Sequence, residues 1–293
     1  MCSSDLAYSG GSIGFDGLFV IKPDGKIYVQ SGIGNLGTES MIDSHRALAE
    51  VLGVPWEKFE ITWGNTSKNL PWSCPSGGSQ TIHAMTRAAH AVGLEGKRLM
   101  AELASLELGG KPEDYDVGGE RVFRKGGGAG LTFAQVAERA IKRGGKFDGH
   151  EVPDGVSRMT KSAVTGLAGQ GLVVAAKDKF KRDGISNSYV AGFAEVEVDL
   201  ETGQYRITDY LGVADVGTVI HPRAFGGQMF GRSSLGWGHA LAQKWVYDQH
   251  YGAPLAKRFY QNRPPTILDV PVANNFKWEA VNIPDPETPR SEE

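Results

Sequence analysis

The feature that most constrains this chain is a local order that occurs in each half: a β-hairpin, a glycine-rich turn and a helix. In the first half, residues 15–21 and 26–31 flank a Lys-Pro-Asp-Gly turn, which predicts a hairpin. The glycine-rich stretch 31–37 follows, and a helix is expected over 38–52. Because the second strand alternates in polarity, this half favours a mostly antiparallel sheet over a buried parallel one.

The second half repeats the order with longer strands. Residues 192–200 and 204–214 alternate in hydropathy around a Glu-Thr-Gly turn, which predicts another hairpin. A helix is expected over 222–243, because proline suits the first position of a helix. Residues 253–275 are rich in proline and predict irregular structure.

Two further helices lie between the hairpins. Apolar residues spaced alternately by three and four predict a long helix that Ser79 caps and that runs to about Leu106. The stripe consists of Ile82, Met85, Ala89, Val92, Gly96, Leu99, Leu103 and Leu106. A second helix is expected over 132–143, with Thr132 as its N-cap.

These elements predict an α+β fold with two sub-domains. We expect them over 7–150 and 191–289, each a small, mostly antiparallel sheet with helices packed on one face. Residues 151–190 are expected to be a linker or an excursion between them. The ends, 1–6 and 290–293, are typical of translated sequencing adapters, so we interpret them as foreign to a natural sequence that continues on both sides.

Composition excludes several classes of protein. Lys plus Arg is 31 and Asp plus Glu is 34, so the net charge of −3 argues against a nucleic-acid binder, which needs a basic face. No stretch approaches about 20 apolar residues, so no membrane span is expected. Two cysteines are too few for a disulfide scaffold, a cysteine-rich zinc site or a cysteine-ligated iron–sulfur cluster.

The first candidate site is the turn Gly32-x-Gly34-x-x-Gly37, between a strand and a helix. This spacing is the dinucleotide fingerprint, but a parallel dinucleotide-binding strand should be almost wholly apolar, whereas Tyr28 and Gln30 share one face here. Glu39 would also oppose a pyrophosphate at the helix N-terminus. A nicotinamide or flavin site, a simple tight turn and a different anionic cofactor all remain open.

The second candidate is the Ser-Gly-Gly-Ser-Gln-Thr sequence at 76–81, which opens the long helix. Main-chain N–H groups at a helix N-terminus, with adjacent hydroxyls, can bind an anion without a basic side chain. An extended ligand could be gripped by this segment and by the first turn together.

The third candidate is the helix over 222–243, which contains five glycines. Each glycine costs about 1 kcal/mol relative to alanine in a helix interior, so close packing or close approach of a ligand should compensate. The amide of Gln228 beside the glycine face could bind a ring edge.

Taken in order, these segments resemble the molybdopterin-binding large subunit of the xanthine dehydrogenase and aldehyde oxidase family. The resemblance covers most of 15–109 and 190–289 and is weak between them. The strings that carry it are GIGNLGTES, LGVPWEKFEITWGNTSKNLPWS, GGSQT, GFAEVEVDLETG, ADVGTVIHP, GGQMFG and IPDPETP.

The resemblance implies a role for each candidate site. The cofactor-binding positions that it implies are Gly37, Thr38, Gly78, Ser79, Gln80, Thr81 and Gln228. Thr38 and Glu39 stand where the family commonly has glutamine and glycine, and Phe230 stands where a glutamate is usual. These departures indicate a divergent branch of the family.

The resemblance also implies the chemistry and the partners. The cofactor would be molybdopterin, as such or in its cytosine dinucleotide form, and its own dithiolene sulfurs would hold the metal, so no protein metal ligand is expected. The reaction would be oxidative hydroxylation of an aldehyde or N-heterocycle as the small-molecule substrate, with a base glutamate beyond the C-terminus and no catalytic residue in this chain, which alone should be inactive.

Iron–sulfur and FAD subunits or domains, and the missing half of the same chain, would be its partners. A cytoplasmic location is expected, with the periplasm left open because the native N-terminus is expected upstream. Two alternatives stand beside this interpretation: an NAD(P)- or flavin-dependent oxidoreductase that uses Gly32-x-Gly34-x-x-Gly37, and a scaffold that has lost its cofactor.

Overall fold

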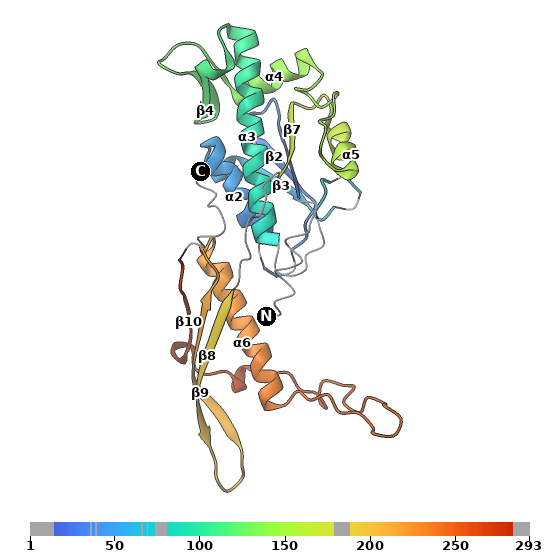
Figure 1. The fold of residues 1–293 in the computed structure, drawn as a ribbon, viewed down its shortest axis with the longest axis vertical. Coiled ribbons are helices and arrows are strands. Elements are labelled where there is room, and N and C mark those ends of the chain that lie inside the picture. The colour runs from blue at the N-terminus through green and yellow to red at the C-terminus, as the bar shows by residue number, and fades with distance from the viewer. Residues whose placement is uncertain are drawn as a thin grey trace. The chain divides into compact units, whose positions relative to one another are not determined.

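The computed structural model forms two compact units (Figure 1). The first comprises Met1–Ile185 with Pro289–Glu293, and the second comprises Ser186–Thr288. The structure describes residues 15–35, 37–38, 40–65, 67–68, 70–73, 81–178 and 188–283, without the side chains of 40–44 and His83. The terminal segments that we interpreted as foreign lie outside the described residues.

The first unit is built on a four-stranded sheet with the order β3-β2-β1-β7. Strand β1 (Asp16–Ile21) pairs antiparallel with β2 (Ile27–Ser31), which confirms the predicted hairpin, and antiparallel with β7 (Leu172–Lys177) on its other side. Strand β3 (Phe59–Trp63) pairs parallel with β2, because helix α2 (Ser40–Leu52) connects the two strands.

Three helices build the larger core on one face of this sheet. Helices α2, α3 (Thr81–Leu108) and α4 (Phe133–Arg143) contribute buried apolar side chains that pack with Phe19 and Val29. Thr132 caps α4 as predicted, since its hydroxyl accepts the N–H of Gln135 at 3.3 Å. The α+β class is therefore confirmed.

A fourth helix, α5 (Arg158–Leu167), covers the opposite face, and Figure 1 shows it across β7 from α3. Its Ala163 and Val164 pack with Leu18 and Val20 of β1. Our sequence analysis placed a linker or excursion over 151–190, whereas the structure has α5 and β7 within it. The segment is polar because α5 is short and buries only one side, so its periodicity is too weak to recognise from sequence.

A small second sheet completes the first unit. Strands β4 (Tyr115–Gly118), β5 (Arg121–Arg124) and β6 (Gly130–Thr132) pair antiparallel in chain order. Short 3₁₀ turns at Trp56–Lys58 and Pro112–Asp114 precede β3 and β4. The sheet lies in the stretch where the family resemblance was weak.

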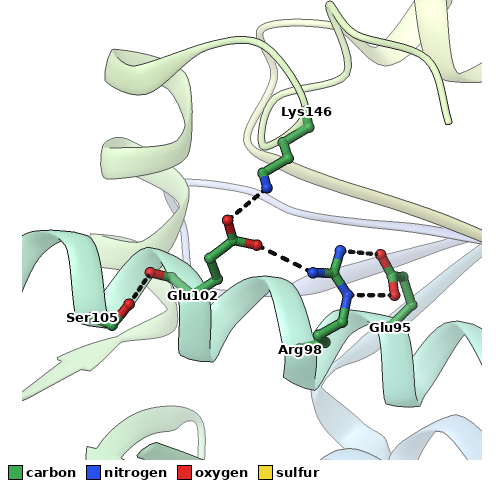
Figure 2. A network of polar contacts seen from close by, with 5 residues as sticks. All are labelled: Glu95, Arg98, Glu102, Ser105 and Lys146. Atoms are coloured by element: carbon green, nitrogen blue, oxygen red, sulfur yellow. Dashed lines mark hydrogen bonds and ion pairs between the residues drawn. The ribbon is translucent and has the colours of Figure 1, made fainter. Parts of the chain in front are cut away.

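A network of ion pairs joins α3 to the segment that follows α4 (Figure 2). Arg98 donates two hydrogen bonds to Glu95, at 2.7 and 2.8 Å, and one to Glu102 at 3.2 Å. Glu102 also accepts from Lys146 at 2.6 Å, across 44 residues of sequence. Because these side chains are partly exposed, the network contributes little stability. It links α3 to Lys146 in the segment that follows α4.

The second unit is a three-stranded sheet covered by one helix. Strand β8 (Tyr189–Val198) pairs antiparallel with β9 (Tyr205–Asp215), which confirms the second predicted hairpin, and β10 (Phe276–Ala280) pairs parallel with β9. Helix α6 (Pro222–Leu241) packs on this sheet through rings with centroid distances of 4.5–5.9 Å. The rings belong to Tyr210, Phe225, Phe230, Trp237, Phe276 and Trp278.

Helix α3 approaches β1 closely at two glycines, one on each element. A Cβ on Gly96 would lie 2.6 Å from the ring of Phe19, and one on Gly17 would lie 2.6 Å from the carbonyl oxygen of Ala88. Phe19 is fully buried, so it has no room to move away. Glycine at 96 is therefore required by packing rather than by backbone conformation.

We expect Gly96→Ala to lower the free energy of unfolding by about 1–3 kcal/mol, because the added methyl overpacks the core. Gly166→Ala, in α5, is the matched control: its Cβ would meet nothing within 4 Å, and we expect a gain of up to about 1 kcal/mol. Urea unfolding followed by circular dichroism measures both. Equal effects of the two substitutions would contradict the packing argument.

Candidate functional site

The first glycine-rich turn packs against the beginning of α3. Ile33, within the turn, is buried in one apolar cluster with Ala84 and Met85 from the first turns of α3. Thr81, the first residue of α3, is also buried. The turn that contains Gly37 and Thr38 thus starts at the end of α3 where Thr81 lies.

Loop 70–73 lies directly against this turn. A Cβ on Gly32 would come within 2.2 Å of the carbonyl oxygen of Pro71 and 3.1 Å of the Oγ of Ser73, so only glycine allows this contact. Pro71 is itself buried. The position of the loop therefore determines where the turn can begin.

The middle of the turn presents bare backbone. A Cβ on Gly34 or Gly37 would meet nothing within 4 Å, and Gly37 has a φ of 87°, which favours glycine. The N–H of Gly37 donates to Oδ1 of Asn35 at 2.8 Å, so this donor is already used within the turn. Thr38 is half-buried and Gly37 is exposed.

The remaining candidate residues are divided between the two units and the undescribed chain. Gly78, Ser79 and Gln80 lie outside the described residues. Gln228 is half-buried in the second turn of α6, in the second unit. Within the described residues of the first unit, Gly37 and Thr38 follow the buried Ile33 in the turn, and Thr81 precedes Ala84 and Met85, which pack with Ile33.

Packing explains only part of the glycine content of α6. A Cβ on Gly226 would lie 2.7 Å from the Trp278 ring, and one on Gly238 would lie 2.2 Å from Oε1 of Gln243. At Gly227, Gly231 and Gly236, by contrast, a Cβ would meet nothing within 4 Å. These three glycines leave helix backbone bare, where another backbone or a flat ligand could approach.

The sheet differs from that of a dinucleotide-binding fold. The turn follows β2, which pairs parallel with β3 through the α2 connection, but β1 pairs antiparallel with both of its neighbours, so the sheet is mixed and the turn does not lie at the switch point of a parallel sheet. Glu60, at the spacing of a ribose-binding carboxylate, pairs with Lys26 at 2.5 Å instead. The geometry therefore disfavours the nicotinamide or flavin alternative.

This end of the first unit presents main-chain N–H groups, hydroxyls and buried oxygen atoms. Its described donors are main-chain N–H groups and hydroxyls, and two buried oxygens near β1 and β2, Asp16 Oδ1 and Ser31 Oγ, have no partner among the described residues. Within the described ranges, no three histidine, cysteine, aspartate or glutamate side chains gather as metal ligands.

Comparison with known proteins identifies the family. Residues 11–271 match the profile of the molybdopterin cofactor-binding domain. The chain belongs to this family. In the described part of this molybdopterin cofactor-binding domain, no helix is both long and apolar enough to cross a bilayer.

Relatives of the molybdopterin cofactor-binding domain are larger proteins. The aldehyde oxidoreductase molybdenum-binding subunit PaoC of Escherichia coli O157:H7 is 25% identical over 271 residues, which are 90% of this chain and 31% of that protein. The aldehyde oxidoreductase of Megalodesulfovibrio gigas is 28% identical over 257 residues, 88% of this chain and 22% of that protein. The chain thus spans at most about a third of these relatives.

A solved structure has the same fold. The quinoline 2-oxidoreductase of Pseudomonas putida 86 superposes with a TM-score of 0.66 at 24% identity, over 95% of this chain and 32% of that one. At this identity the likeness establishes the fold alone.

One departure from the family pattern has a structural explanation. Phe230 of the molybdopterin cofactor-binding domain packs edge-on against Phe276 at 4.5 Å, so it joins α6 to β10. A glutamate there would bring a charge next to this aromatic cluster. Glu39, another departure from the family pattern, lies outside the described residues.

Sequence reasoning missed two buried polar residues at this end of the domain. Asp16 is 1% exposed and Thr160 is fully buried, and the two hydrogen bond to each other. The available signal was an acidic residue in the otherwise apolar strand FDGLFVI. Thr160 gave no signal, because it lies in the segment that we interpreted as a linker or an excursion.

His45, in α2 a few residues after the first turn, is a third buried polar group. Burial lowers the pKa of His45 to about 4, from 6.5, and its Nε2 has no partner among the described residues. The ring is therefore neutral in the folded domain at neutral pH. A base with a depressed folded-state pKa contributes no penalty above its unfolded pKa and destabilises the fold as pH falls below it.

We expect the domain to lose up to about 3 kcal/mol of stability as pH falls from about 6.5 to about 4, because unfolding lets His45 take up a proton. His45→Leu should remove this slope between pH 6.5 and 4.5, above the range where paired carboxylates protonate. Urea midpoints at several pH values measure it. The same slope in both proteins would show that His45 is not the cause.

Proposed function

We propose that this chain binds the pterin and phosphate of a molybdenum cofactor as part of an oxidoreductase of the xanthine dehydrogenase and aldehyde oxidase type. The observation that carries the proposal is the family match over 11–271. The geometry of the first unit supports it, because the glycine turn after β2 lies against the start of α3. The relatives that are aldehyde oxidoreductases support the reaction class.

The residues of this chain would hold and orient the cofactor. Thr38 and Thr81 would offer hydroxyl and main-chain donors at the end of the first sheet, beside the exposed peptide of Gly37. Gly78, Ser79 and Gln80 would extend this cradle, and Gln228 would donate its side-chain amide. When bound, the cofactor would supply a redox-active molybdenum for oxidative hydroxylation of an aldehyde or an N-heterocycle.

Uncharged donors suit this task. Hydrogen bonds from main-chain amides select an anionic, flat ligand by geometry. They do not neutralise the charge of the ligand's anionic group. The cofactor would be molybdopterin or its cytosine dinucleotide form.

The complete enzyme would need more than these residues. We propose that a glutamate outside these 293 residues accepts the proton in the reaction, that further segments of the same polypeptide complete the cofactor site, and that iron–sulfur and FAD subunits or domains carry electrons away. The partial coverage of the relatives, 31% and 22%, supports this division. We propose a cytoplasmic location.

One observation favours a second candidate, a scaffold that no longer binds the cofactor. The N–H of Gly37, a predicted donor, is engaged by Asn35, and Thr38 replaces the glutamine common in the family. A scaffold and an enzyme differ in a single measurable property, the presence of molybdenum and pterin in the purified full-length protein.

We expect the full-length protein, produced in a host that makes the cofactor, to contain about one molybdenum and one pterin per chain. Metal analysis and pterin fluorescence after oxidation measure these contents. Protein that is folded yet empty of both would establish the scaffold instead.

Gln228→Ala should weaken cofactor retention about tenfold, the loss expected for one hydrogen bond to a charged or polar group. Arg232→Ala, one turn further along α6 with an exposed side chain, is the matched control and should retain the cofactor. Molybdenum content after dialysis compares the two. Equal retention would remove Gln228 from the site.

A further inference from the structure

A buried carboxylate joins three segments of the first unit. Asp16, at the start of β1, is 1% exposed, and its Oδ2 accepts the main-chain N–H of Ser157 at 2.7 Å and the hydroxyl of Thr160 at 2.5 Å. Ser157 is the N-cap of α5, so the carboxylate lies at the positive end of this helix. This placement explains how a charge is tolerated inside the fold.

Thr160 connects the same carboxylate to loop 70–73. The N–H of Trp72 donates to Oγ1 of Thr160 at 2.8 Å, while the N–H of Asp16 donates to the carbonyl of Trp72 at 3.1 Å. The Thr160 hydroxyl thus accepts from the loop and donates to the carboxylate. Both main-chain groups of Trp72 are held by this pair of residues.

Burying this carboxylate lowers the free energy of unfolding relative to an apolar pair. Oδ1 of Asp16 is buried without a partner among the described residues, and a buried carboxylate loses much of its hydration. An apolar pair of similar volume would avoid both costs. The benefit that remains is geometric, because the hydrogen bonds define one position for loop 70–73.

That position matters for the first glycine turn. The carbonyl oxygen of Pro71 occupies the space that a side chain at Gly32 would fill, so the loop covers the start of the turn. Ile33, the next residue, is buried against Met85 of α3. The turn is therefore held between loop 70–73 and α3, and a shift of the loop would release one side of it.

We propose that Thr160, together with Asp16, is a positioning residue for the cofactor: it fixes loop 70–73 against Gly32 and so holds the turn in the conformation that binds the pterin. The inference rests on the proposed function, and Thr160, which is fully buried, would act on the turn rather than by touching the cofactor. It acts through Trp72 and Pro71.

The test compares three variants of the full-length protein purified from a host that makes the cofactor. Thr160→Val keeps the shape and removes the hydroxyl, whereas Thr160→Ser keeps the hydroxyl. Val164→Ala, one turn along the same helix and buried against Leu18 and Val20, is a control for simple destabilisation. Thermal melting confirms that each is folded at the assay temperature and that the control is at least as destabilised as Thr160→Val.

We expect Thr160→Val to retain the cofactor about tenfold less well, equivalent to about 1.4 kcal/mol, with Thr160→Ser and Val164→Ala close to wild type. Hydrogen exchange should also show loss of protection at the N–H groups of Asp16 and Trp72 in Thr160→Val alone. Cofactor content that follows melting temperature across all variants would overturn the positioning role.

Failure of the proposed function and failure of the positioning role of Thr160 give different results. A folded wild-type protein without molybdenum or pterin would end the proposed function, whatever the variants do. A wild type that carries the cofactor, beside a Thr160→Val variant that carries it equally well, would end the present inference and leave the proposed function standing.

Discussion

The close contact between α3 and β1 sets the geometry of the first unit. Gly17 and Gly96 allow the helix and the strand to approach until a single added methyl would overlap its neighbour. Because α3 is held so near the sheet, its first turns reach Ile33 and form a small apolar cluster with it. The same packing that stabilises the unit therefore brings Ala84 and Met85, near the beginning of α3, against Ile33 of the glycine turn.

Buried polar groups also shape the first unit, and they do so at a cost in stability. Asp16, Ser31 and His45 are all buried with an atom that has no partner among the described residues, an arrangement that costs stability. Asp16 is connected to loop 70–73 through Thr160 and Trp72, and Ser31 directly precedes the turn. In the second unit, by contrast, apolar contacts do this work: helix α6 is held on the sheet by an aromatic cluster around Phe276.

Sequence patterns predicted those elements whose characteristic residues lie within one short segment. Both hairpins, the Thr132 cap of α4 and the helix α3 were predicted because turn residues, capping hydroxyls and periodic apolar positions act within a few residues, although Leu106 at the end of the predicted stripe is 50% exposed. The class of fold followed from their order. The prediction failed at α5 and β7, because a short helix and a strand that pairs with β1 across more than 140 residues leave little local pattern.

The sequence alone determined the family resemblance, the α+β class and the candidate residues Gly37, Thr38, Thr81 and Gln228, since short motifs and spacing are properties of the chain itself. Only the tertiary structure decided that the first turn lies between α3 and loop 70–73, and that Asp16 and Thr160 hold this loop. The physical reason is that these contacts join residues far apart in sequence, and their energies depend on burial and hydrogen-bond geometry that exist only after the chain has folded.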